Sequence, residues 1–169
     1  MEKWGAGRYG DPCRECGFGF GLTPEQAVAA VRAVPAAFAE RLAGATGREE
    51  LPGLAWSTSA YTSHVADNLR AWSGWLAGAV RGGDLAAPGY DPDLLAQARR
   101  YNQLSLAGAL WSLQGAADAW LQALTEALAG QVVLQHATRG PQRAEDVARN
   151  NAHDAHHHLW DIDRILRAQ

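Results

Sequence analysis

Long apolar runs are missing from this chain of 169 residues, and so are clusters of basic residues. A helix that crosses a bilayer needs about 20 consecutive apolar residues, and the opening residues 1–4 lack the apolar core of a secretory signal. The formal net charge is −3, and no helix face is basic, which argues against a nucleic-acid-binding surface. We therefore expect a cytoplasmic protein with no membrane or nucleic-acid partner.

Cysteine is scarce, and with only Cys13 and Cys16 a disulfide framework is not expected. Both cysteines lie in a glycine-rich arm, residues 1–22, that shows no helical period. A Cys-x-x-Cys followed by glycine and an aromatic residue resembles half of a zinc-ribbon knuckle, but a structural site needs four ligands and no second cysteine pair exists. Three interpretations stay open: two free thiols in a turn, a redox pair with a lowered thiol pKa, or half of a metal site that histidine or a second subunit completes.

Four long segments carry apolar residues at the spacing of amphipathic helices. They span about 23–44, 57–81, 102–129 and 142–167. Apolar residues make up 47% of the chain and charged residues 20%, which is typical of a globular domain. No strand alternation is strong enough to build a sheet. The sequence therefore predicts an all-α four-helix bundle over residues 23–169, preceded by the short irregular arm.

Local signals mark where helices begin. Thr23-Pro24-Glu25-Gln26 has a capping residue, a proline at the first helical position and a glutamine that can complete a capping box. Asp91 followed by Pro92 starts a short helix in the loop after the second segment. Residues 132–141 are expected to form a long connection with some extended character.

Tryptophan is abundant for this length. Large aromatic side chains dominate the buried area of small domains, so we expect these residues to fill the core and its edges rather than to form a ligand site. The seven are Trp4, Trp56, Trp72, Trp75, Trp111, Trp120 and Trp160.

The segment 150–162 holds four of the six histidines of the chain. Residues i and i+4 of a helix share a face, which gives two pairs, His153 with His157 and Asp154 with His158. On a helical wheel, Asp154 and His158 lie at the edge of the apolar stripe, whereas the other pair lies on the opposite side. A metal between packed helices needs ligands at the buried edge. We therefore favour Asp154 and His158 as ligands and expect His153 and His157 on a solvated face.

A third ligand is available in the segment 57–81, where His64 borders the apolar stripe. A lone histidine at such a position is more often a hydrogen-bonded core residue than a ligand, but the Asp–His pair of the last helix offers it a role. Imidazole and carboxylate both suit divalent zinc, nickel or iron. The sequence thus predicts a metal site formed by His64, Asp154 and His158, with the alternative that His153 and His157 replace the last two.

Two motifs at this separation resemble those of the DinB/YfiT superfamily. They are Tyr61-x-x-His64-Val65-x-Asp67 and His153-Asp154-x-x-His157-His158-Leu159-x-Asp161-Ile162. The resemblance runs from about residue 23 to residue 167 and includes the order of the four helices. It implies the same three ligands, with Asp154 standing where many members have histidine. A carboxylate at that place is similar to the mycothiol-dependent branch, which uses glutamate.

The resemblance implies a divalent metal, zinc or nickel, and transfer of mycothiol, bacillithiol or a similar low-molecular-weight thiol to a small electrophile. It also implies a homodimer. Three protein ligands leave positions open on the metal, as catalytic sites do. Two alternatives stay open: a metal-dependent hydrolase that uses water at the same site, and a non-enzymatic metal or redox sensor that uses Cys13 and Cys16. Asp161 could orient a ligand histidine, or it could be an exposed partner of His157.

Overall fold

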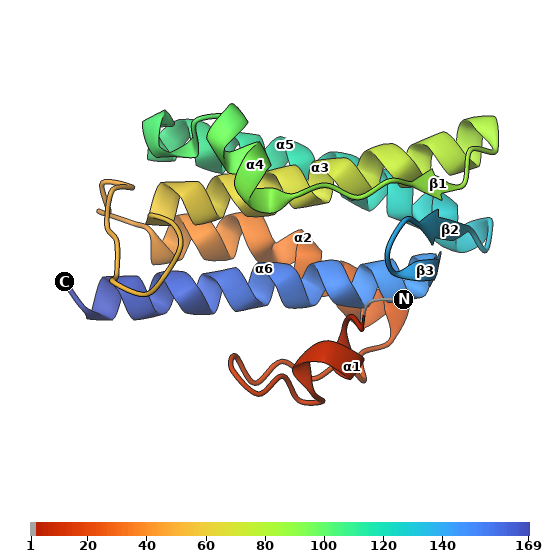
Figure 1. Cartoon of the computed structure of the whole chain (residues 1–169), viewed down its shortest axis with the longest axis horizontal. Helices are drawn as coiled ribbons and strands as arrows, with labels where there is room; N and C mark the ends of the chain where they lie inside the picture. Colours follow the sequence, from red (N-terminus) through yellow and green to blue (C-terminus); the bar gives the residue numbers. More distant parts are fainter. Residues whose placement is uncertain (1–2) are drawn as a thin grey trace.

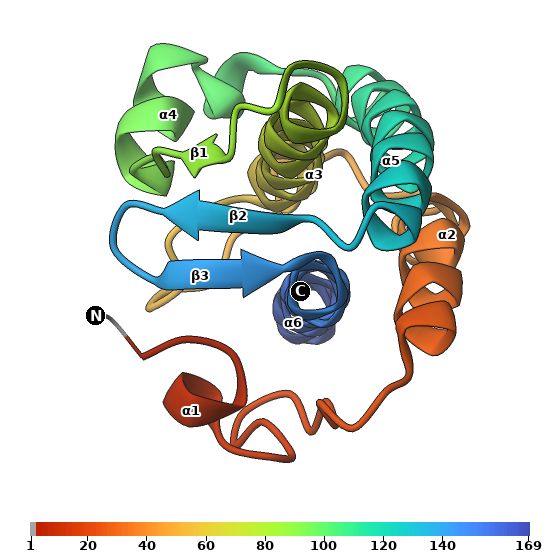
Figure 2. The ribbon, with the colours of Figure 1, turned by 90° about the vertical axis from the view of Figure 1, so that its right-hand side faces the viewer.

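Four long helices run side by side in the computed structural model, which describes residues 3–169 (Figures 1 and 2). They are α2 (Pro24–Arg41), α3 (Thr58–Gly82), α5 (Leu106–Ala129) and α6 (Ala144–Arg167). Helix α3 packs mainly against α5, and both α2 and α3 contact α6. The predicted four-helix bundle is confirmed. None of the helices in the described part of the chain combines the length and apolarity that crossing a bilayer requires.

Capping side chains set the helix starts. At the start of α2, Thr23 accepts a hydrogen bond from the Gln26 backbone and Gln26 accepts one from the Thr23 backbone, so the predicted capping box forms. Ser57 is the N-cap of α3, where its side chain accepts a hydrogen bond from the Ala60 backbone amide. Helix α5 begins later than predicted because Ser105 caps it. The residues just before it form a separate 3₁₀ turn, η1 (Tyr101–Gln103).

The core lies where the four helices meet. Its large side chains are fully buried, and each contributes about 1.5–3 kcal/mol of transfer free energy. They include Phe38, Leu69, Leu76, Leu113, Trp120, Leu124 and Ile162. The expectation for tryptophan holds for Trp120, which is fully buried in the core, whereas Trp111 is 82% exposed. Trp72 is buried but also lines a pocket, as do Trp56 and Trp75.

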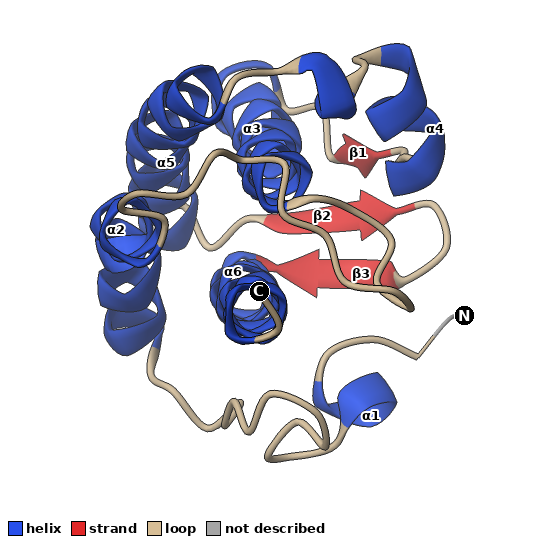
Figure 3. Cartoon of the chain, turned by 90° about the vertical axis from the view of Figure 1, so that its left-hand side faces the viewer, coloured by secondary structure: helices blue, strands red, loops and turns tan. Residues whose placement is uncertain are grey.

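A small sheet was not predicted, and its presence corrects the sequence analysis. It contains β1 (Ala86–Ala87), β2 (Val133–His136) and β3 (Gly140–Arg143), with β1 parallel and β3 antiparallel to β2 (Figure 3). Leu134 pairs with Gln142, and both are fully buried. Strands this short present only one or two inward residues each, which leaves too little alternation to detect.

Two segments outside the bundle complete the structure around α3 and α6. The loop between α3 and α5 carries α4 (Pro92–Ala98), which begins as predicted where Asp91 accepts hydrogen bonds from two backbone amides. The N-terminal arm carries α1 (Ala6–Tyr9) and lies along the side of α6 away from α3 (Figure 2). Its Cys13, Phe18 and Phe20 are buried against the core. Residues 1–2 of the predicted arm lie outside the described residues.

Candidate metal centre and its pocket

The three predicted ligands converge between α3 and α6. Oδ1 of Asp154 lies 3.8 Å from Nε2 of His64 and 3.7 Å from Nε2 of His158. One donor atom from each residue lies within 4.8 Å of the other two. His64 is buried and the other two side chains are half-buried. The structure therefore brings together two imidazoles and one carboxylate, a donor set that suits a divalent transition metal.

Asp161 orients one of these imidazoles. Its Oδ2 lies 3.1 Å from Nδ1 of His158, and Asp161 itself is buried. A proton on Nδ1 that is shared with this carboxylate leaves the Nε2 lone pair of His158 directed at the site. Asp161 also lies 3.9 Å from Nε2 of His157. Of the two interpretations of Asp161, the orienting role agrees with this geometry, because the residue is not exposed.

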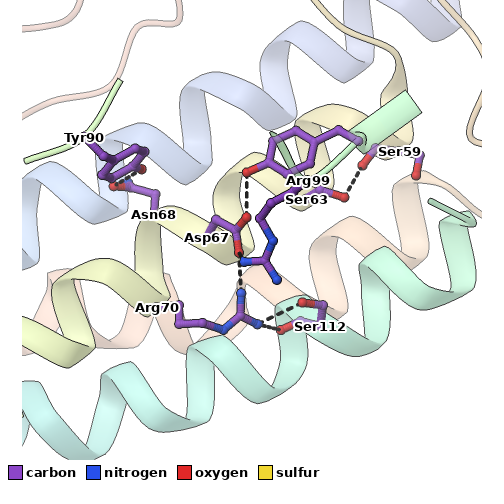
Figure 4. Close-up of polar contacts among 9 residues, drawn as sticks. Ser59, Ser63, Asp67, Asn68, Arg70, Tyr90, Arg99 and Ser112 are labelled. Atoms are coloured by element: carbon purple, nitrogen blue, oxygen red, sulfur yellow. Dashed lines mark hydrogen bonds and ion pairs between the residues drawn. The ribbon is translucent and has the colours of Figure 1, made fainter. Parts of the chain in front are cut away.

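Asp154 is held by a second chain of contacts. Asn68 donates from Nδ2 to Oδ2 of Asp154 at 2.8 Å. Tyr90 donates its hydroxyl to Oδ1 of Asn68 at 3.1 Å, as Figure 4 shows. Burial raises the pKa of Tyr90, so its hydroxyl stays a donor. Burial opposes ionisation of Asp154, yet contacts with His64, His158 and Asn68 outweigh it and hold the pKa of this carboxyl below its usual range. Asp154 is therefore an anion with one oxygen free for a ligand.

The surroundings of His64 and Asp154 fit a bound cation. Within residues 3–169, no arginine or lysine forms an ion pair with Asp154, and its basic partners are the imidazoles of His64 and His158. The His64 ring packs against Trp56 at 4.9 Å and against His158 at 4.7 Å between ring centroids. A half-buried carboxylate that has no arginine or lysine partner would gain from a divalent ion, because the ion would compensate for its desolvation.

Asp67, part of the first motif, does not belong to this centre. Figure 4 shows Asn68 paired with Tyr90, while Asp67 points to Arg70 and Arg99 instead. Its other oxygen accepts a hydrogen bond of 2.6 Å from the Tyr101 hydroxyl. Asp67 therefore ties α3 to η1 and to the end of α4, and its role is structural.

The centre opens into a pocket of about 860 Å³. Most of its walls are side chains that the sequence analysis did not identify as functional. They are Arg8, Tyr9, Trp56, Trp72, Trp75, Tyr90, His136 and Arg139. His136 stacks on Trp72 at 5.7 Å and contacts Trp75 edge-on at 6.0 Å. Aromatic walls with two arginines suit an organic ligand that carries negative charge.

The other histidine pair of α6 is not on a solvated face, which corrects the prediction. His153 is 5% exposed and His157 is half-buried, because Tyr9, Phe18 and Phe20 of the arm cover them. An irregular arm has no period from which this packing could be predicted. Burial, with neighbouring imidazoles, lowers the pKa of His153 to about 4, so the ring is neutral at pH 7.

Cys13 and Cys16 lie beside this pair. Burial raises the pKa of the Cys16 thiol to about 11. Redox-active Cys-x-x-Cys pairs show the opposite shift, so the environment of Cys16 does not favour the redox interpretation.

The hydrogen bond from Asn68 gives a testable prediction. We expect Asn68→Ala to weaken metal binding about 10–100-fold, because Asp154 loses the partner that orients it. Tyr101→Phe is the control, since it removes a hydrogen bond to the neighbouring Asp67 without touching the centre. Dissociation constants from competition with a chromogenic chelator check this. Equal metal affinity of wild type and Asn68→Ala would contradict the orienting role.

Comparison with known proteins identifies the fold. No protein-family model matches the sequence, and no curated protein matches it either. Among solved structures, YfiT from Bacillus subtilis is similar over 86% of each chain, with a TM-score of 0.74 and 17% sequence identity. That protein is described as a probable metal-dependent hydrolase with an unusual four-helix bundle topology. The chain therefore has the YfiT-like four-helix bundle fold, in agreement with the resemblance of its motifs.

Proposed function

We propose that this chain is a metal-dependent enzyme that transfers a low-molecular-weight thiol, such as mycothiol or bacillithiol, to a small electrophile in the cytoplasm. His64, Asp154 and His158 would hold a divalent ion, zinc or nickel. The single observation that carries the proposal is the position of this three-donor set at the wall of a pocket of about 860 Å³. That volume lies in the range of organic ligand sites and suits a thiol cosubstrate together with an electrophile.

Each side chain has a distinct task in this proposal. A divalent ion in such a site lowers the pKa of a bound thiol or water. Asn68 and Asp161 keep Asp154 and His158 in their binding orientation. Arg8 and Arg139 line the same pocket and would attract carboxylate or phosphate groups of a substrate.

The transfer step follows from this arrangement. The thiol loses its proton to solvent, and its sulfur attacks the electrophilic carbon. A carbon–sulfur bond forms while the leaving group departs with its electron pair, so no oxidant or reductant is needed.

Hydrolysis is the second candidate, and the structural likeness to YfiT favours it. A set of two histidines and one carboxylate also occurs in zinc hydrolases. In a hydrolase, the same three ligands would hold the metal and the same pocket would bind the substrate, with water in place of the thiol. The two candidates differ in one measurable requirement, the cosubstrate.

Turnover with and without thiol separates the candidates. We expect zinc- or nickel-loaded protein to consume chlorodinitrobenzene only when mycothiol, bacillithiol or cysteine is present, and to lose activity on chelation. His158→Ala should lower the rate at least about 100-fold, because a ligand is lost. Release of nitrophenol from nitrophenyl esters without thiol would instead favour the hydrolase. Rates equal to those of His158→Ala in both assays would reject the proposed catalysis.

A further inference from the structure

Four more metal-ligand side chains meet on the adjacent face of α6, where the arm packs against the helix. Cys13 and Cys16 of the arm face His153 and His157 of the helix, and one donor atom from each lies within 4.8 Å of the other three. Tetrahedral zinc with two sulfur and two nitrogen ligands places its donors roughly 3.3–3.8 Å apart, so small side-chain rotations would close the set. We propose that Cys13, Cys16, His153 and His157 form a second, structural zinc site that fastens the arm to α6.

The backbone around the cysteines has the form of a metal knuckle. The Cys13 amide donates to the Phe18 carbonyl at 2.8 Å, and the Gly17 amide donates to the Cys13 carbonyl at 3.0 Å. Gly17 has a φ of 75°, a left-handed conformation that glycine adopts without strain. This tight turn brings both thiols to the side that faces α6. The half-site seen in the sequence thus has the local structure that a complete site needs.

The histidines contribute two nitrogens that lack other partners. Within residues 3–169, Nε2 of His153 and Nδ1 of His157 are buried and have no hydrogen-bond partner. Buried polar atoms are rarely left without one, so each points to a ligand. The other ring nitrogen of His157, Nε2, lies 3.3 Å from the Glu15 carboxylate and 3.9 Å from that of Asp161. Carboxylates in this position orient metal-binding imidazoles.

The surroundings suit a closed site rather than a catalytic one. Tyr9 and Phe20 pack on the His153 ring at 4.7 and 4.8 Å between ring centroids, and Phe18 lies at 5.4 Å. Cys13 is buried. Two thiols and two imidazoles complete a four-ligand shell and leave no position for a substrate.

The second site would support the pocket through the arm. Arg8 and Tyr9 precede Cys13 by a few residues and line the pocket of the first site. Consecutive residues of α6 serve the two sites, since His153 precedes Asp154 and His157 precedes His158. The proposal goes beyond the proposed catalysis, because zinc here would position pocket residues and take no part in the reaction.

Cobalt substitution tests the second site. Tag-free protein, reduced and loaded with cobalt without oxygen, should bind about two ions per chain and show the near-ultraviolet thiolate-to-cobalt absorption of a sulfur-ligated ion. Cys13→Ser with Cys16→Ser should lose this absorption and one ion. His64→Ala should lose one ion and keep the absorption. His156→Ala is the matched control: its exposed ring contacts the Cys16 carbonyl and the Phe18 ring and is not one of the four donors, so both ions should remain.

Absence of the thiolate absorption in cobalt-loaded wild type would overturn the second site, whatever happens at the first. A double cysteine variant that fails to fold does not weaken the test, because alkylation of wild type gives a second measurement. Iodoacetamide should modify both cysteines only after a chelator removes the metal. Equal alkylation rates with and without bound metal would also overturn the proposal.

Discussion

Asp154→Ala is expected to abolish metal binding at the His64 centre and, with it, the proposed thiol transfer. The variant removes the only carboxylate among the three donors and leaves two imidazoles that belong to different helices. Loss of an orienting partner alone costs about 10–100-fold in affinity, so loss of a ligand should exceed that range. Plasma mass spectrometry on tag-free protein and chelator competition measure the effect.

Asp146→Ala provides the matched control for this prediction. Asp146 lies on α6 as well, but it pairs with Arg149 at the surface, far along the helix from the centre. It should keep the metal content of the wild type. One ion should also persist in Asp154→Ala if the cysteine site holds zinc, and combining it with Cys13→Ser and Cys16→Ser should remove that ion. Unchanged metal content in the combined variant would contradict both assignments.

The first centre could be predicted because it depends on helical geometry. Residues four apart share a helix face wherever the helix lies, so Asp154 and His158 form a pair before any packing is known. The apolar stripe then shows which face is buried, and it separates this pair from His153 and His157. His64 follows by the same argument on the second helix. Periodicity thus predicted that these three candidate ligands lie close together, as the structure shows.

The pocket walls could not be predicted, because they come from segments without a period. Tyr90 lies in the loop before α4, and His136 ends a short strand. Neither position carries a local signal that places it against α3. The same limit explains the error on His153 and His157, whose face is buried by an arm that has no amphipathic pattern. Contacts between an irregular segment and the helices depend on tertiary packing, which no local sequence pattern encodes.

Three of the four histidines on α6 belong to one of the two side-chain clusters: His158 to the first, and His153 with His157 to the second. His158 packs against His64 of α3, and His153 packs against Tyr9 and Phe20 of the arm. Buried imidazoles need partners. Asp154 and Asp161 are partners of His158, Asp161 also lies near His157, and the cysteines would supply the remaining partners of His153 and His157.

Trp120→Ala should cause the largest loss of stability among single substitutions in the core. Trp120 is fully buried, and its Nε1 donates to Oδ1 of buried Asn151 at 2.8 Å, which joins α5 to α6. The cavity costs about 3–5 kcal/mol, and an unsatisfied Asn151 adds about 1–3 kcal/mol. Since domains are stable by only about 5–15 kcal/mol, the variant should be close to unfolding. Urea titration followed by far-ultraviolet circular dichroism measures the change.

Trp111→Ala is the control, because it makes the same change on the same helix at a side chain that is 82% exposed. Its free energy of unfolding should stay within about 0.5 kcal/mol of the wild type. Trp120→Phe keeps a six-membered ring but removes the indole donor and part of the ring volume, so its loss should include the Asn151 contribution of about 1–3 kcal/mol and stay below that of Trp120→Ala. Similar losses for Trp111→Ala and Trp120→Ala would mean that α5 does not pack on α6 through Trp120. That result would also remove the support that α5 gives to α6 two residues before His153.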